Sequence, residues 1–376
     1  MDEYTLEVLD QPGDIHWNDL LTALPGVHIL QTSYWAKVKA RVGWRAEYLI
    51  WKDMNGNIKG ASLVLIKTLP LIGRLLKTCI IYTPRGPILD WADSSLASRV
   101  LQDLIEFGKS KKAIFLKIDP DLPIAFGLPG SEGFRTEIIG QGVVERLLIE
   151  NWKYSSDQIQ FKNTIVLDIS LPEPELLSRM KQKTRYNISL AARKGVTVRQ
   201  GTPSDFPVLY HMYVQTALRD GFAIRDEEYY RFVWEMLYNA NMAMPILAEV
   251  DGQPVSALIL FMYAKKAYYF YGMSTGEQKD KMPNHLLQWE AIRYAKTAGC
   301  LAYDFWGAPD VFSENDSMWG VFRFKDGFNG TIISGIGAWD FVFDHTLFKV
   351  YSEMMPAFLS IMRRIGRKRV SDEVNT

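Results

Sequence analysis

The sequence has little of what marks secreted, metal-binding or membrane-spanning proteins. Its 376 residues include only two cysteines, Cys79 and Cys300, which are too few for a disulfide framework or a thiolate metal site. The five histidines lack metal-ligand spacing such as HExxH, so we predict no metal site. No window contains the roughly 18 apolar residues of a membrane span, and the acidic start MDEYTLEVLDQPGD lacks the apolar core of a secretory signal. We therefore expect a cytoplasmic protein whose thiols are reduced and buried.

The chain also lacks net charge, because 43 Lys and Arg residues balance 43 Asp and Glu residues. One stretch departs from this balance. Residues 180–200, MKQKTRYNISLAARKGVTVRQ, hold six Lys or Arg side chains and no Asp or Glu. A run of this kind is usually the solvated face of a domain whose acids lie elsewhere. The alternative is a surface that follows the phosphates of a nucleic acid.

The length predicts two domains, since single hydrophobic cores stop growing near roughly 250 to 300 residues. Residues 46–90 give three apolar runs, followed by a helical pattern at 98–109 and the strand AIFLKIDP. From Pro245 onward three apolar runs again precede a helical pattern, NHLLQWEAIRYAKTAG, and the strand LAYDFWG. Asn-Gly and Asp-Gly pairs separate the first two runs in each region and mark hairpins. Asp119 and Asp304 close the matching strands, so we predict two similar α/β domains.

This order of elements resembles the GNAT (N-acetyltransferase) fold. The resemblance implies an α/β (α+β) chain of two tandem GNAT-like domains, residues 1–163 with 334–376 and residues 164–333. That family holds acetyl-coenzyme A by its pyrophosphate, on backbone amides of a Gly-rich turn at a helix N-terminus. Here the slot reads STGEQKDKMPNHLLQ, in which Gly276 is alone and Pro283 supplies no amide, and TPRGPILD in the first half is no better. We therefore expect no coenzyme A and a different acyl donor.

The run KTRYNISLAARKGV, which follows the strand TIVLDIS, resembles the stretch that opens the second domain in the FemABX family. This family comprises aminoacyl-tRNA-dependent transferases that build peptidoglycan cross-bridges. Further stretches agree in family order, namely QTSYWAKVKARVGW, YTPRGP, LKIDP, YYFYGMS, LLQWEAIRYAKTAGCLAYDFWG and GVFRFKDGFNG. The resemblance covers most of the chain and, without the long coiled-coil insertion, is to the shorter, FemX-like form. It implies an enzyme that moves an amino acid from aminoacyl-tRNA to the side-chain amine of a peptidoglycan precursor stem peptide.

The resemblance places catalysis at FRFKDGF, where Lys325 matches the family lysine near the transferred acyl group and Phe324 lies beside it. Attack of an amine on an aminoacyl ester builds a tetrahedral oxyanion, which a preorganised cation stabilises. An arbitrary lysine at a helix end would more often be solvated. No histidine occurs in a family motif, so we expect desolvation of the acceptor ammonium, with proton transfer through the ribose hydroxyl of the tRNA, instead of a protein base.

Four positions match those that hold the nucleotide-linked precursor in FemX-like members, and a fifth matches an aspartate of the peptide region. They are Lys39, Arg225, Tyr229, Tyr271 and Asp119. Lys37 competes with Lys39 for the first place. Asp226 and the acids after it in IRDEEYY also fit a helix start, and Asp119 also fits an aspartate that organises a turn.

In this family context we favour tRNA as the partner of the basic stretch, which consists of Lys181, Lys183, Arg185, Arg193, Lys194 and Arg199. A second basic cluster lies near the C-terminus, in a run with apolar helical spacing: Arg363, Arg364, Arg367, Lys368 and Arg369. That run fits a helix packed on the first domain with a basic end, a membrane-surface helix, or a second tRNA contact. We prefer a helix that packs on the first domain, with electrostatic attraction at its basic end. We also expect a monomer. Peripheral contact with the inner membrane face is the open alternative for the C-terminal run.

Two other functions remain open at this point. The first is a related N-acyltransferase acting on a lipid, a protein N-terminus or an exopolysaccharide precursor, since it would share every motif. The second is a non-catalytic binding module that retains the fold. Lys325 and the basic stretch argue against the binding module, because neither is required for packing.

Overall fold

The computed structural model describes residues 3–69 and 77–354, which form two compact units. The first unit consists of Met1–Thr164, Asp310–Phe312 and Ile332–Glu353. The second is built mainly from Ile165–Pro309 and Ser313–Thr331.

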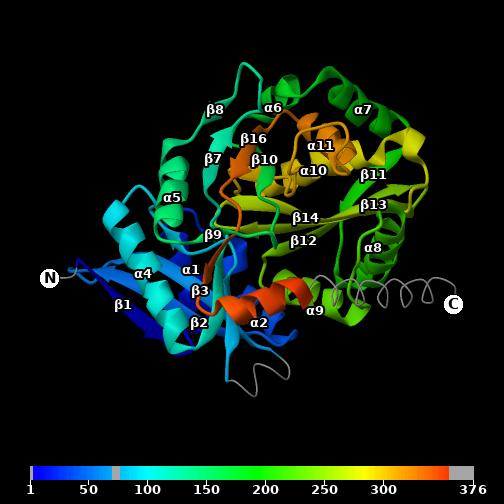
Figure 1. Cartoon of the computed structure of the whole chain (residues 1–376). Coiled ribbons are helices and arrows are strands. Elements are labelled where there is room, and N and C mark those ends of the chain that lie inside the picture. Colours follow the sequence, from blue (N-terminus) through cyan, green and yellow to red (C-terminus); the bar gives the residue numbers. More distant parts are fainter. Residues whose placement is uncertain (1–2, 70–76, 355–376) are drawn as a thin grey trace. The chain divides into compact units, whose positions relative to one another are not determined.

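The first unit is a mainly antiparallel sheet in the order β1-β2-β3-β4-β6-β17-β9, with helices packed on it (Figure 1). Its strands are β1 (Tyr4–Leu9), β2 (Arg45–Asp53), β3 (Ile58–Thr68), β4 (Cys79–Thr83), β5 (Ile88–Leu89), β6 (Ala113–Ile118), β7 (Pro123–Phe126), β8 (Arg135–Thr136), β9 (Lys153–Tyr154), β16 (Thr331–Gly335) and β17 (Trp339–Val342). Its helices are α1 (Asp14–Thr22), η1 (Ile29–Gln31), α2 (Ser33–Ala40), α4 (Ser94–Ser110) and α5 (Ile138–Ile149). Strands β7, β8 and β16 are not part of this sheet, and β7 pairs with β8 and with β16.

In the second unit the strand order is β11-β12-β13-β14-β15-β10, and helices cover both faces. Its strands are β10 (Asn163–Asp168), β11 (Val196–Gln200), β12 (Ala243–Val250), β13 (Gln253–Tyr263), β14 (Lys266–Ser274) and β15 (Ala302–Asp304). Its helices are α6 (Glu173–Arg179), α7 (Gln182–Arg193), η2 (Pro203–Asp205), α8 (Phe206–Asp220), α9 (Glu227–Asn239), η3 (Lys279–Lys281), α10 (Pro283–Thr297) and α11 (Trp319–Asp326). Helices α7 and α10 lie above the sheet in Figure 1, and α8 and α9 lie below it.

Both units repeat one set of strand pairings, which confirms the predicted order of elements. Strands β2, β3 and β4 pair antiparallel, and β4 then pairs parallel with β6 after the crossover helix α4. Strands β12, β13 and β14 do the same, and β14 pairs parallel with β15 after α10. The turn between β12 and β13 has positive φ at both Asp251 (52°) and Gly252 (74°), the geometry that Asp-Gly favours in a tight hairpin.

Helix α4 begins at Ser94, four residues before the predicted start, because Asp93 caps it. The Asp93 carboxylate accepts a hydrogen bond from the Leu96 amide at 2.9 Å, which satisfies an amide that the helix itself leaves open. The apolar face of α4, with Val100 and Leu104 fully buried, joins the core of the sheet. The helix thereby closes the hydrophobic core of the first unit.

The described part of the C-terminal region packs on the first unit. A helix begins at His345, and the Phe348 and Tyr351 rings lie 5.2 and 5.1 Å from the ring of Phe115. The basic residues of the predicted second cluster, within 363–369, lie outside the described residues, as does the rest of 355–376 that the sequence assigned to the first domain. None of the helices in the described part combines the length and apolar character that a membrane crossing requires.

Two glycines of α5 provide a matched test of packing. A Cβ on Gly140 would overlap the carbonyl oxygen of Pro123, whereas a Cβ on Gly142 would meet nothing within 4 Å. We expect Gly140→Ala to destabilise the protein by about 2 kcal/mol, since a backbone atom cannot move aside easily. Gly142→Ala should be neutral or stabilise by up to about 1 kcal/mol through helix propensity. Denaturant unfolding of both variants checks this, and equal effects would contradict the packing.

Candidate active site

Lys325 lies on the buried side of α11, three residues after Phe322, so one helix face carries both into the interior of the second unit. Its side chain is almost fully buried, with 5% of the residue exposed. The amine Nζ donates hydrogen bonds to the backbone carbonyl oxygens of Trp306 (3.0 Å) and Gly307 (2.7 Å), which we call the carbonyl pair. Among the described residues Nζ has no third polar partner, so one of its bonding directions is open.

The turn after β15 presents the carbonyl pair. Trp306 has a φ of 56°, which is uncommon for a bulky residue and indicates a conformation that its surroundings hold in place. The Trp306 amide donates to Oδ1 of Asp304 at 2.8 Å, and the Trp306 ring packs 4.5 Å from that of Phe270. These contacts fix the turn that faces Lys325.

The protonation of Lys325 is balanced near neutrality. Burial lowers the pKa of the Lys325 amine to about 7, and the negative charge of Asp304 opposes part of this effect. The ring of Tyr269 lies 5.8 Å from Nζ. The amine can therefore be a cation or a neutral group at physiological pH.

Phe324, the predicted neighbour of the catalytic lysine, contacts a histidine that the sequence motifs did not include. The His285 ring lies 5.1 Å from the Phe324 ring, and its Nε2 is 3.2 Å from the side-chain amide of Asn187. Burial, together with the charge of Lys183, lowers the pKa of His285 to about 4. At neutral pH this imidazole is uncharged and a weak base.

Three of the predicted substrate residues meet in the second unit. The Arg225 guanidinium lies 4.8 Å from the ring of Tyr229, and Tyr230 connects Tyr229 (5.4 Å) with Tyr271 (5.7 Å). The Tyr213 ring packs on Tyr230 at 5.2 Å and on Tyr271 at 5.7 Å. We call Tyr213, Tyr229, Tyr230 and Tyr271 the tyrosine cluster.

The helix-start role proposed for Asp226 is confirmed. Its carboxylate accepts a hydrogen bond from the Tyr229 amide at 3.0 Å and caps α9, and Glu227 and Glu228 follow in the first turn. Arg225 directly precedes the cap and Tyr229 supplies the capped amide, so capping and the predicted binding role are compatible.

The other two predicted substrate residues lie in the first unit. Lys39, on α2, extends over the ring of Trp35 at 4.8 Å, while its competitor Lys37 forms an ion pair with Asp14. Asp119 is 1% exposed, and its carboxylate accepts hydrogen bonds from the Tyr82 hydroxyl (2.7 Å) and the backbone amide of Arg85.

The contacts of Asp119 are those of an aspartate that organises a turn, which was the alternative for this residue. Burial raises the pKa of the Asp119 carboxyl to about 6, against the opposing effects of Arg85 and Tyr82. The turn that Asp119 holds carries Arg85, whose guanidinium donates to the Phe161 carbonyl at 2.6 Å and lies 3.8 Å from the Asp121 carboxylate.

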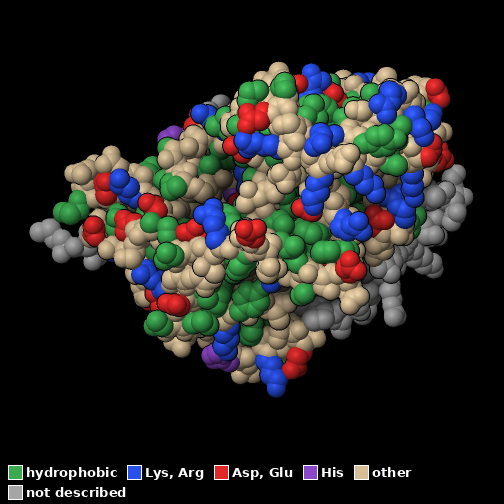
Figure 2. Space-filling model, turned by 90° about the horizontal axis from the view of Figure 1, so that it is seen from above, with side chains coloured by type: hydrophobic (Ala, Val, Ile, Leu, Met, Phe, Trp, Pro, Cys, Tyr) green, Lys and Arg blue, Asp and Glu red, His purple; other side chains and the backbone are tan. Residues whose placement is uncertain are grey.

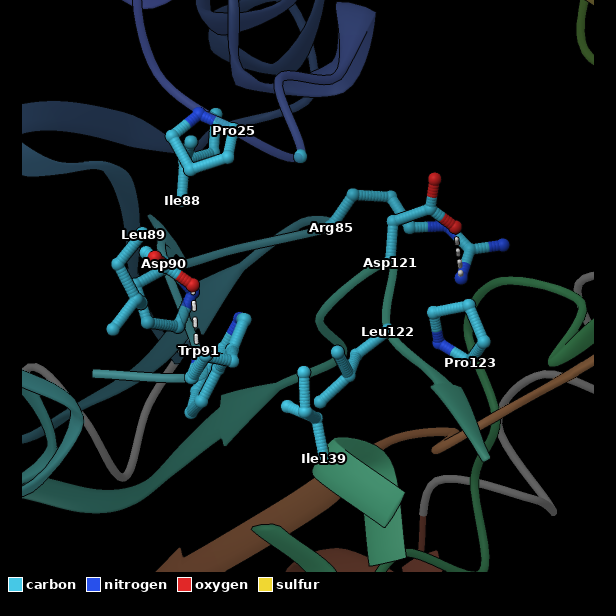
Figure 3. Close-up of a pocket in the computed structure, with 13 residues that line it drawn as sticks. Pro25, Arg85, Ile88, Leu89, Asp90, Trp91, Asp121, Leu122, Pro123 and Ile139 are labelled. Atoms are coloured by element: carbon cyan, nitrogen blue, oxygen red, sulfur yellow. Dashed lines mark hydrogen bonds and ion pairs between the residues drawn. The ribbon is translucent and has the colours of Figure 1, made fainter. Parts of the chain in front are cut away.

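A pocket of about 250 Å³ opens beside this turn in the first unit (Figure 3). Arg85 and Asp121 lie together on one side of it, and Ile139 of α5 points into it from below in Figure 3. The other walls are mostly apolar, with Leu89, Trp91, Leu122 and Pro123 among them. The pocket therefore combines apolar walls with a guanidinium and carboxylates, a composition that suits a small peptide.

The basic stretch is only partly free of acidic partners. Lys181 pairs with Asp326, Lys194 lies 3.0 Å from Asp280, and Arg199 lies 2.8 Å from Asp205 and 2.7 Å from Glu249. Figure 2 accordingly shows Lys and Arg side chains with Asp and Glu among them on the face seen from above, not a patch of one charge.

The remaining three basic residues lie on α7 without a carboxylate partner in the described part of the chain. Lys183 and Arg193 are exposed, and the Arg193 guanidinium lies 5.9 Å from the Tyr186 ring. Arg185 is half-buried and donates to the carbonyl oxygens of Ser178 and Met180. Lys183 and Arg193 are thus the members best able to meet an anion.

The start of α7 is joined to the end of α11. The Lys181 amide donates to the Gly327 carbonyl at 3.0 Å, and the Lys181 amine pairs with Asp326. A Cβ on Gly327 would overlap the hydroxyl of Thr184, so the two segments are in closest contact there. The basic stretch and the helix of Lys325 are therefore one packed assembly.

Several amides at the start of α10 already have hydrogen-bond partners within the chain. Lys281 and Met282 donate their amides to the carbonyls of Gln278 (2.9 Å) and Lys279 (3.1 Å), His285 donates to Met282 (3.1 Å), and Pro283 has no amide hydrogen. In the first unit the Arg85 amide is bonded to Asp119 and the Gly86 amide to the Thr83 carbonyl at 3.2 Å. These amide donors at the two slots are thus engaged within the chain.

Comparison with known families decides where the chain belongs. The FemAB family model matches residues 21–253 and 247–355, which together cover most of the sequence. The chain belongs to the FemAB family. Among relatives of this FemAB protein, the lipid II:glycine glycyltransferase of Staphylococcus epidermidis is 24% identical over 92% of this chain and 95% of its own. That of Staphylococcus aureus strain MRSA252 is 23% identical over the same shares.

The fold of this FemAB protein matches that of a solved relative. The crystal structure of FemX has a TM-score of 0.79 and 21% identity, over 92% of this chain and 99% of FemX. The predicted fold class, two tandem N-acetyltransferase-like domains, is thereby confirmed. Among the described helices α4 is the longest, with 17 residues, so the described part of the chain has no long coiled-coil insertion.

Several site residues of this FemAB protein were not predicted. Tyr213 and Tyr230 could have been suspected, because the stretches YHMY and EEYY each contain two tyrosines and lie on two different helices. The carbonyl pair could not, since backbone atoms carry no sequence signal. The link from Asp304 to Lys325 also depends on a turn whose conformation could not be predicted from the sequence.

Proposed function

We propose that this protein is an aminoacyltransferase, which moves an amino acid from aminoacyl-tRNA to the side-chain amine of a peptidoglycan precursor. The observation that carries the proposal is the setting of Lys325. A buried amine with two directions held by backbone carbonyls and one direction open is suited to meet a single developing negative charge. Relatives named as lipid II:glycine glycyltransferases support this class of reaction.

The reaction needs little from the protein beyond placement and charge. The acceptor amine attacks the carbonyl carbon of the aminoacyl ester, and a C–N bond forms as the carbonyl oxygen becomes an oxyanion. The third N–H of the Lys325 ammonium donates to this oxygen. The ester C–O bond then breaks, and the proton lost by the amine goes to the leaving ribose oxygen of the tRNA.

Two features support charged tRNA as the acyl donor in place of coenzyme A. Several amides at the two slots already have partners, and a coenzyme pyrophosphate that used them would have to break those hydrogen bonds. The exposed Lys183 and Arg193 lie on α7, which is joined at its start to the helix of Lys325. Phosphate contacts at such a surface would add affinity without reading a base sequence.

For the acceptor, we propose that the pocket of the first unit receives part of the stem peptide. Methyl side chains would lie against Leu89 and Leu122, and a peptide oxygen or carboxylate would face Arg85. As a separate proposal for the second unit, Arg225 and the tyrosine cluster would bind the diphosphate or sugar of a precursor. The acceptor is either nucleotide-linked or lipid-linked, the latter with peripheral contact at the membrane.

Product analysis tests the proposed reaction. The purified protein is incubated with a mixture of aminoacyl-tRNAs and either a nucleotide-linked or a lipid-linked pentapeptide, and the products are weighed by mass spectrometry. We expect a mass increase of one amino-acid residue on the acceptor. Lys325→Met should lower kcat by about 10² to 10³, because it removes the oxyanion donor. A product formed from acetyl-coenzyme A, and none from the tRNA, would refute the proposal.

Blocking the pocket tests the peptide site. Ile139→Trp places a large ring at the pocket wall and should raise the acceptor KM about tenfold with kcat little changed. The matched control is Ile138→Trp, because residue 138 is 83% exposed and does not line the pocket. Equal kinetics for the two variants would exclude this pocket from acceptor binding.

Charge reversal tests the RNA surface. The double variant Lys183→Glu with Arg193→Glu should raise the KM for aminoacyl-tRNA about tenfold and reduce the slope of affinity against salt by about 1 to 2. The control, Lys52→Glu with Lys109→Glu, makes the same change in net charge on exposed or partly exposed sites of the first unit. If both doubles behave alike, the effect is one of net charge and the assignment to α7 fails.

A further inference from the structure

Asp304 is the last residue of β15, and the turn that follows it connects it with the amine of Lys325. Its Oδ1 accepts the Trp306 amide at 2.8 Å, and the carbonyls of Trp306 and Gly307 accept from Lys325 Nζ at 3.0 and 2.7 Å. One carboxylate oxygen thus holds the turn whose carbonyls hold the amine. An aspartate that bonds a backbone amide two residues on is the usual device for fixing such a turn.

The second oxygen of Asp304 is held by a cation from the neighbouring strand. Oδ2 lies 2.9 Å from the amine of Lys266 on β14, and Asp304 is 3% exposed. The Lys266 amine also lies 5.0 Å from the ring of Tyr268. A buried carboxylate is costly to desolvate, and the contact with Lys266 offsets part of that cost.

Asp304 therefore interacts with two lysines that differ in burial and in distance from its carboxylate. Lys266 touches it directly and is partly exposed, whereas Lys325 is buried and feels its charge through space. Within residues 3–69 and 77–354, the ring of Tyr269 also faces Lys325, at 5.8 Å. It is uncharged at neutral pH, and burial raises the pKa of its hydroxyl further, to about 12. Asp304 is thus the charged group that favours an ammonium at Lys325 against the effect of burial.

We propose that Asp304 is the positioning residue of the acyl-transfer site, which holds the Trp306–Gly307 turn that orients Lys325 and supplies a negative charge that favours its ammonium form. This inference rests on the proposed function for its catalytic meaning. The geometric part, from Asp304 through the turn to Lys325, concerns the protein alone and is testable without substrate.

Three variants separate the two parts of the role. Asp304→Asn keeps an oxygen for the Trp306 amide and removes the charge, while Asp304→Ala removes both. Lys266→Met removes the cation that offsets Asp304 and leaves the turn in place. The variants are compared with the wild type by ¹³C NMR titration of the lysine ε-methylenes, with Lys325→Met to assign the signal.

The titration should move in opposite directions. Burial and Asp304 together set the Lys325 pKa at about 7, so the ammonium is present below that pH and is lost as pH rises through it. Asp304→Asn removes a stabilising anion and should lower the midpoint. Lys266→Met removes a repelling cation and strengthens the field of Asp304, so it should raise the midpoint.

Transfer kinetics should follow the titration. The fall of kcat with rising pH should shift to lower pH in Asp304→Asn and to higher pH in Lys266→Met. Asp304→Ala should lose about a hundredfold in kcat at fixed pH, because the amine is no longer oriented, and Asn should restore part of it. A merely structural role would not move the pH limb in two directions.

An unchanged Lys325 midpoint in both Asp304→Asn and Lys266→Met would overturn the inference, as would an Asn variant as inactive as Ala with the wild-type midpoint. If the wild type shows no transfer with any aminoacyl-tRNA while the midpoints move as expected, the proposed function fails and the electrostatic role of Asp304 stands. Asp304→Asn, which preserves the turn, keeps the test open if the Ala variant does not fold.

Discussion

The burial of the Lys325 amine is the constraint on which the candidate site of the second unit depends. Burial disfavours the charged form of Lys325, and backbone carbonyls together with an aspartate offset only part of that penalty. A protein built only for stability would place an apolar side chain here. The turn after β15, in which Trp306 has a positive φ, brings two carbonyl oxygens to the Lys325 nitrogen.

The regular part of the fold could be predicted from the sequence because it depends on local patterns. Alternating and continuous apolar runs gave the strands, and Asp-Gly gave the hairpin whose two turn residues have positive φ. The start of α4 differed by four residues, because Asp93 as a cap extends the helix beyond its apolar pattern. Pairings such as β4 with β6 follow from the crossover helix between them.

The candidate site was less predictable, because its parts are joined by distances in space and by backbone atoms. Arg225, Tyr229 and Tyr271 were assigned through a family resemblance. They do meet, through Tyr230 and Tyr213, neither of which was predicted as a site residue. Composition could not say which basic residues have acidic partners, since Asp326 is 145 residues from Lys181 in the chain. Asp119 had two interpretations from sequence, and its contacts are those of the turn.

The lack of a Cβ at Gly327 allows α7 and α11 to approach each other closely. The φ of Gly327 is −59°, an ordinary helical value, so the backbone does not require glycine there. The requirement is one of volume, because the Thr184 hydroxyl fills the place of a side chain. A larger residue would require a shift of the Thr184 side chain or of the joined ends of α7 and α11, the helix that carries Lys325. The close approach of α7 and α11 therefore depends on a residue without a side chain, two residues along the chain from Lys325.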